Sequence, residues 1–84
     1  MTYIGIGYSG NNPSFLRDMV KENNEWLKGD RIPRFFGDNF LIMYDSNTAR
    51  EFARKCKDAL HNGGKIYVYP MGKPYHQSPP ETQA

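Results

Sequence analysis

Along this chain of 84 residues, hydrophobic residues are spaced as in strands in some segments and as in helices in others. The order of these segments constrains the fold more than any other feature. Residues 2–8 read TYIGIGY and residues 65–69 read KIYVY; both segments alternate as strands do. Between them, residues 13–27 and 48–60 repeat hydrophobic residues at helical spacing. The sequence therefore predicts two helices placed between an initial and a final strand.

The segment between the two helices is predicted to be a β-hairpin. Residues 31–36 form its first arm, the Gly-Asp-Asn turn at 37–39 reverses the chain, and residues 40–45 form the second arm. Pro33 confines the first arm to a sheet edge, because proline has no backbone donor. The resulting order predicts an α+β, ferredoxin-like βαββαβ fold, with a four-stranded sheet and two helices on one face. If residues 31–36 are not a strand, the alternative is a three-stranded parallel βαβαβ sheet.

Polar residues and glycines predict where each helix begins and ends. Asn12 reads as the N-cap of the first helix, with Pro13 in its first turn. Thr48 and Glu51 have the spacing of a capping box at the start of the second helix, and the glycine pair at 63–64 supplies its C-cap.

Length and composition predict one soluble globular domain, which we assign to residues 1–71, followed by a mobile polar tail over residues 72–84. The single cysteine, Cys56, excludes an internal disulfide and suits a reducing compartment. The first residues do not show the basic and apolar regions of a secretory signal. The longest apolar run, at 40–44, is too short to cross a bilayer. We therefore expect a cytoplasmic protein that does not contact a membrane.

Three glycines near the start, Gly5, Gly7 and Gly10, have the G-x-G-x-x-G spacing of a dinucleotide-binding turn. Such a turn needs a full strand before its first glycine and a helix that opens at its third. Only four residues precede Gly5, and the helix signals at Asn12 and Pro13 come after Gly10. We therefore place Gly5 and Gly7 within a strand and expect no nucleotide cofactor.

The aromatic residues predict a contact surface on the sheet, because they make up 14% of the chain, more than so small a core can hold. In a ferredoxin-like sheet, Tyr3, Tyr67 and Tyr69 would lie on the open face. Glycine in a strand marks a close approach by another chain or ligand, which we expect at Gly5 and Gly7. The tail or a second copy of the chain would cover the same face equally well. The candidate contact residues are Tyr3, Gly5, Gly7, Phe40, Tyr67 and Tyr69.

A stripe of basic residues on the second helix is another candidate contact surface. It suits phosphate or an acidic partner, although at a net charge of +2 an ordinary solvated face explains it as well. Two arginines before the hairpin turn would extend the stripe, and Asp30 and Asp38 would dilute it. The candidate basic residues are Arg31, Arg34, Arg50, Arg54 and Lys57.

Catalytic chemistry finds no support in the sequence. His61 and His76 are far apart, and no group of histidine, cysteine and carboxylate residues has the spacing of a metal site. Cys56 lies on the apolar side of its helix, where it packs in the core, and Asp45 and Ser46 read as capping groups. We therefore expect a non-enzymatic protein with no metal and no cofactor.

The order of elements is similar to that of RNA-recognition motifs, which stack bases on aromatic residues of the open sheet face. When their third-strand pattern is aligned with residues 36–43, FGDNFLIM, only Gly37 and Phe40 match strictly. Asp38 would place a negative charge where the base and its phosphate should lie. The sequence shares the predicted topology of RNA-recognition motifs but not the residues with which they bind RNA. It therefore does not predict that the protein belongs to that family.

Two functions follow from these surfaces. The first is a small adaptor or inhibitor that binds another protein, a class frequent among phage and mobile-element products that block host factors; tyrosine and tryptophan dominate such contacts. The second is binding of single-stranded nucleic acid on the open face, with the aromatic rings stacking on bases and the arginines contacting phosphate. A homodimer through the open face is compatible with either function.

Overall fold

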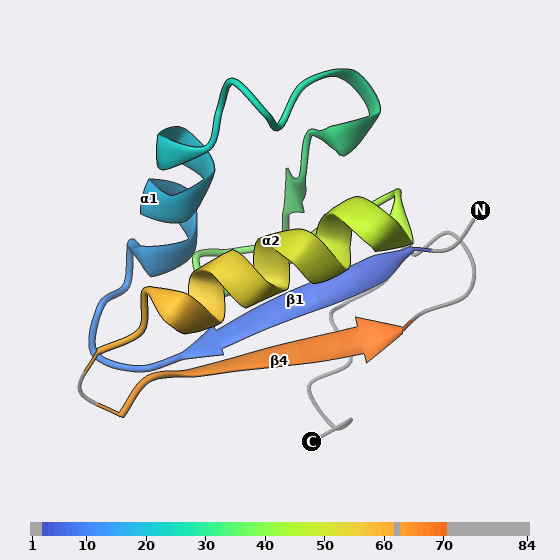
Figure 1. The fold of residues 1–84 in the computed structure, drawn as a ribbon. Coiled ribbons are helices and arrows are strands. Elements are labelled where there is room, and N and C mark those ends of the chain that lie inside the picture. Colours follow the sequence, from blue (N-terminus) through green and yellow to red (C-terminus); the bar gives the residue numbers. More distant parts are fainter. Residues whose placement is uncertain (1–2, 62, 71–84) are drawn as a thin grey trace.

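The elements of this domain follow the order that the sequence predicts (Figure 1). The structure, a computed structural model, describes residues 3–61 and 63–70; the tail predicted for residues 72–84 lies outside them. The described elements are β1 (Ile4–Ser9), α1 (Phe15–Glu22), the 3₁₀ helix η1 (Gly29–Arg31), β2 (Arg34–Phe35), β3 (Phe40–Met43), α2 (Ser46–Asp58) and β4 (Lys65–Pro70).

The described strands form one antiparallel sheet in the order β2-β3-β1-β4. β1 is central and pairs with β3 on one side and β4 on the other, while β2 pairs with β3. All three pairings are antiparallel, so the three-stranded parallel alternative is wrong. The domain is therefore a small α+β domain, and β2 and β4 are the edge strands of the described sheet.

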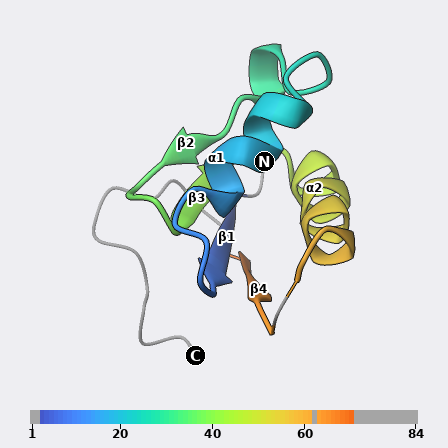
Figure 2. The same ribbon diagram turned by 90° about the vertical axis from the view of Figure 1, so that its left-hand side faces the viewer.

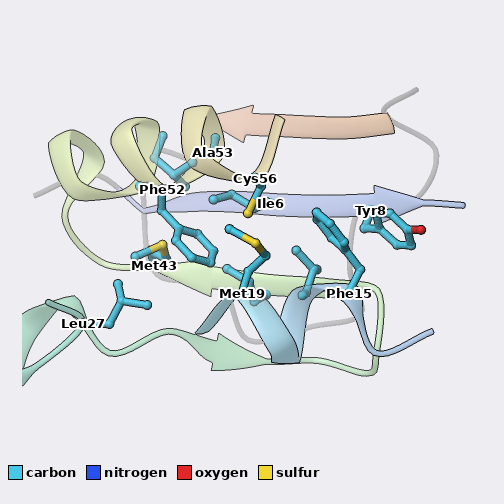
Figure 3. Close-up of a cluster of buried hydrophobic side chains, with 13 residues drawn as sticks. Ile6, Tyr8, Phe15, Met19, Leu27, Met43, Phe52, Ala53 and Cys56 are labelled. Carbon is cyan, nitrogen blue, oxygen red and sulfur yellow. The ribbon is translucent and has the colours of Figure 1, made fainter. Parts of the chain in front are cut away.

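The core lies between the sheet and the two helices, which cover the same face (Figure 2). In β1, Ile4 and Ile6 are fully buried and Tyr8 nearly so; Ile4 is paired with Met43, and Ile6 with Leu41. Figure 3 shows the side chains of Ile6, Tyr8 and Met43 beside those of both helices. The helical and loop members of the core are Phe15, Leu16, Met19, Leu27, Ala49, Phe52, Ala53 and Cys56. Each large side chain contributes roughly 1.5–3 kcal/mol through burial, so this one cluster supplies most of the driving force for folding.

Helix α1 is shorter than predicted at both ends because asparagine side chains bind its flanking backbone. Asn12 is not the N-cap: its Oδ1 accepts hydrogen bonds from the backbone N–H and the hydroxyl of Ser14, 3.2 and 3.0 Å away, and so holds the turn before the helix. At the other end, the Asn23 amide donates to the Met19 carbonyl oxygen at 2.8 Å. The Asn23 backbone N–H donates to the same carbonyl at 3.1 Å, and the helix ends at Glu22, not near residue 27.

Helix α2 begins at Ser46, so the capping box predicted at Thr48 is wrong. Its N-cap is Asp45, one of the two residues that the sequence marks as capping groups. The carboxylate of Asp45 accepts from the Asn47 backbone N–H at 3.2 Å and from the Thr48 hydroxyl at 2.8 Å. The Thr48 hydroxyl bond is the main reason why the pKa of Asp45 lies below its ordinary value. The helix ends at Asp58 with Ala59 as its C-cap, before the predicted glycine pair.

The predicted hairpin is present, with a shorter first arm. The 3₁₀ helix takes up Arg31, and β2 begins only after Pro33. In the turn, Gly37 has a φ of +110°, a conformation that favours glycine, and the Phe36 N–H donates to the Phe40 carbonyl at 2.9 Å.

Gly10 lies against the side chain of Tyr8, which explains why this third glycine of the fingerprint spacing is required. The Tyr8 ring stacks on Phe15 with centroids 4.7 Å apart, and its hydroxyl accepts a hydrogen bond from the Asn12 N–H at 3.1 Å. A Cβ atom on Gly10 would lie 2.6 Å from the Tyr8 Cζ atom and would overlap the hydroxyl oxygen. Packing of a core tyrosine accounts for this glycine.

We expect Gly10→Ala to destabilise the fold by about 1–3 kcal/mol, because the added methyl displaces Tyr8 from its stack on Phe15. Urea unfolding followed by circular dichroism measures this change. Gly7→Ala is the matched control, since its Cβ would lie at ordinary contact distances of 3.4 Å or more from its neighbours. We expect the control to leave stability unchanged or to raise it by about 0.4–1 kcal/mol. Equal destabilisation by the two variants would contradict this account of Gly10.

Candidate functional site

The sheet face opposite the helices carries most of the predicted contact residues. Residues directly opposed in an antiparallel pair share a face. Gly5 is opposed to Ile42 and Tyr69, and Gly7 to Phe40 and Tyr67. Tyr3 and Tyr44 extend the same rows and meet edge to face, with centroids 5.1 Å apart. We call this surface the tyrosine face; it comprises Tyr3, Gly5, Gly7, Arg34, Phe40, Ile42, Tyr44, Tyr67 and Tyr69.

All six predicted contact residues therefore come together on one face. Ile42 and Tyr44 were not among the predicted contact residues, although the alternation from Phe40 through residue 44 indicates them. They share a face with Phe40 because a strand turns every second side chain to the same side. Arg34 was predicted to extend the basic stripe of the second helix, whereas its pairing with Ile42 places it on the tyrosine face.

The rings of the tyrosine face contact one another across the central strand. Phe40 of β3 and Tyr69 of β4 have centroids 5.8 Å apart, and Tyr67 stacks near Tyr69 at 6.4 Å. A Cβ on Gly7 would lie 3.4 Å from Tyr69 and 3.6 Å from Phe40. The close approach expected at Gly7 is thus supplied by this chain's own rings, which lie over the strand at ordinary contact distance from that position.

The rings differ in how much surface they offer. Phe40 and Ile42 are buried, with 8% and 5% of their surface exposed. Tyr3, Tyr44 and Tyr69 are half-buried, and Tyr67 is the most exposed at 37%. The buried pair therefore supports a tyrosine-rich surface whose most accessible ring is Tyr67.

Three of the predicted basic residues gather on the other side of the sheet. Arg50, Arg54 and Lys57 line a hollow of about 510 Å³ between α2 and β4, together with Ala53 and Val68. Val68 is paired with Ile6, so it belongs to the row that faces the helices. The described residues that line this surface, which we call the basic hollow, include no carboxylate.

The remaining two basic candidates lie elsewhere. Arg31 lies beside Trp26, with its guanidinium carbon 5.9 Å from the ring centroid, and Lys55 approaches the same ring at 5.4 Å. Arg34 is on β2, at the sheet edge opposite β4. The structure therefore separates the five predicted basic residues into three places, and only those of the basic hollow adjoin one another.

Within the described residues, no three side chains of the metal-binding types come close enough to hold an ion. Cys56 is fully buried, and desolvation raises the pKa of its thiol to about 12, so the reactive thiolate is strongly disfavoured. None of the helices in residues 3–61 and 63–70 has the length and apolar character needed to cross a bilayer. In comparisons with known proteins, no family model matches this chain, and no curated protein or solved structure matches it.

We expect Cys56 to react with a thiol reagent only when the domain unfolds. In native buffer at pH 8 the labelling rate should follow the opening of the core, and in denaturant it should rise to that of a free cysteine. The pKa of the Cys56 thiol is higher in the folded protein than its ordinary value of 9, so below pH 9 its ionisation does not change the free energy of unfolding. As the pH rises from 9 towards 12, the free energy of unfolding decreases, because the thiol ionises in the unfolded chain first. Mass spectrometry of iodoacetamide-treated protein measures the rate. Rapid labelling in native buffer would contradict the core assignment.

Proposed function

We propose that this protein is a non-enzymatic binding protein that acts as an adaptor or inhibitor by contacting another protein through its tyrosine face. The observation that carries this proposal is the separation of the aromatic rings from the clustered cations. The rings lie on the helix-free face, and the basic hollow lies on the helix side of the sheet.

The chemistry of the tyrosine face suits a protein partner. Tyrosine combines a large apolar ring with a hydroxyl that forms a hydrogen bond at the rim of an interface. The rings of Tyr67, Tyr69 and Phe40 already contact one another, so binding would cost less side-chain entropy than ordering isolated rings. The buried Phe40 supports the contact, and Tyr67 offers the most accessible area.

Single-stranded nucleic acid is a poorer fit to the same face. Base stacking needs exposed ring faces with cations beside them for the phosphates. Phe40 is only 8% exposed, and of the five predicted basic residues only Arg34 lies on the tyrosine face. A strand of nucleic acid lying flat on the tyrosines would not reach the cations of the basic hollow, which lie on the helix side of the sheet.

We further assign the domain to the ferredoxin-like βαββαβ class. The support is the antiparallel order β2-β3-β1-β4, with α1 between β1 and β2 and α2 between β3 and β4. The free, buried Cys56 supports a reducing location such as the cytoplasm. The fold class by itself does not specify a function, so the argument rests on the two surfaces.

Affinity capture from nuclease-treated lysate tests the proposed function. We expect Tyr67→Ser to reduce recovery of the partner by about tenfold or more, because it removes the most accessible ring of the interface. Ile32→Ser is the matched control: Ile32 is 62% exposed and lies in the connection between η1 and β2, outside the tyrosine face. The control should recover the partner as the unmodified chain does.

Two results would contradict the proposed function. One is equal recovery of every captured protein by Tyr67→Ser and Ile32→Ser. The other is recovery that disappears when nuclease is added, since that would make nucleic acid the ligand. Thermal unfolding of both variants checks that the comparison is between folded proteins.

A further inference from the structure

The edge of β4 is the longer of the two edges of the described sheet. β4 spans six residues, Lys65–Pro70, and β1 is its sole neighbour in that sheet. Every second residue of an edge strand turns its backbone N–H and C=O away from the sheet, where another strand can pair with them. The opposite edge, β2, has two residues and follows Pro33, so it offers little to pair with.

The basic hollow lies directly beside this edge. Its lining joins three cations of α2 to Val68 of β4, and none of the three has an ion pair among the described residues. Arg50, Arg54 and Lys57 are all exposed. A ligand lying along β4 on the helix side would therefore meet three positive charges and no carboxylate of the lining.

The two sides of β4 present different chemistry to an added strand. Tyr67 and Tyr69 point to the tyrosine face, and Ile66 and Val68 point to the helix side, where the cations lie. The side chains of an added strand would alternate in the same way. Acidic residues on one side would meet the basic hollow, and apolar residues on the other would meet the tyrosines.

We propose that the partner contributes an extended segment that pairs with the edge of β4, with alternating acidic and apolar residues. This proposal rests on the proposed function, because it specifies the kind of partner that the tyrosine face accepts. Strand addition at a sheet edge draws affinity from backbone hydrogen bonds and specificity from alternate side chains. A polypeptide alone can form both sets of contacts; a nucleic acid has no backbone amides to pair with β4.

A synthetic peptide tests the inference. The probe is an eight-residue fluorescein-labelled peptide in which glutamate and valine alternate, and the control peptide carries lysine in place of glutamate. We expect fluorescence anisotropy to detect binding of the glutamate peptide alone. Methylation of alternate backbone nitrogens along one edge of the glutamate peptide should abolish binding, because it removes the donors that pair with β4.

Charge reversal in the basic hollow provides the matched protein variants. We expect Arg54→Glu to weaken binding of the glutamate peptide by about tenfold, through loss of one attraction and gain of one repulsion. Arg31→Glu makes the same change of charge on η1 beside Trp26, outside both the tyrosine face and the basic hollow, where it should change binding by less than about twofold. Hydrogen exchange should show new protection of the β4 amides when the glutamate peptide is bound.

Several results would overturn the inference. They are failure of the glutamate peptide to bind, equal binding of the lysine peptide, equal effects of Arg54→Glu and Arg31→Glu, and binding without protection of β4 amides. Tighter binding of a single-stranded oligonucleotide that Arg54→Glu abolishes would overturn it too, because the cations would then serve phosphate. The proposed function is judged separately by the Tyr67→Ser capture, which does not depend on Arg54 or on the peptide.

Discussion

The pairing of β1 with both β3 and β4 is the constraint on which the rest of the structure depends. Because β1 is central, the alternation of its side chains assigns each residue of the neighbouring strands to one of two faces. Ile4, Ile6 and Tyr8 turn to the helices and build the core, while Gly5 and Gly7 turn away. A register shift of one residue would turn the tyrosines of β4, or the residues of β3 that now face away from the helices, towards the isoleucines of β1 and would expose the core. The core and the tyrosine face therefore exist only in this register.

The alternation of strands and the helical periods could be read from the sequence because each depends on local spacing. The ends of the elements could not, because they depend on particular hydrogen bonds. Asn23 is the C-cap of α1 and its side chain binds the Met19 carbonyl, and Asp45 is the N-cap of α2, before the predicted capping box. Local propensity does not distinguish between two capping residues that lie three positions apart, such as Asp45 and Thr48. The bond that forms in the packed domain decides between them.

The candidate site was predictable to the same extent. The tyrosine face follows from alternation within strands, so its six predicted members come together. The basic residues were harder, because linear spacing on α2 does not show which strand lies beneath the helix. Their separation depends on the packing of α2 over β1 and β4, which brings Arg50, Arg54 and Lys57 beside Val68. The position of Phe40 and Tyr69 above Gly7 was not predictable either, because the two rings come from strands that are distant in sequence.

β4 connects the tyrosine face to the basic hollow, because consecutive residues of one strand point to opposite faces. Tyr67 and Tyr69 contribute to the first surface and Val68 to the second. A partner that lies flat on the sheet contacts only the tyrosines, and one that lies against α2 contacts only the cations. A partner that runs along the β4 edge reaches both surfaces with alternate side chains. Because only one strand separates the two surfaces, a domain of this size can recognise both apolar and acidic residues in one extended segment.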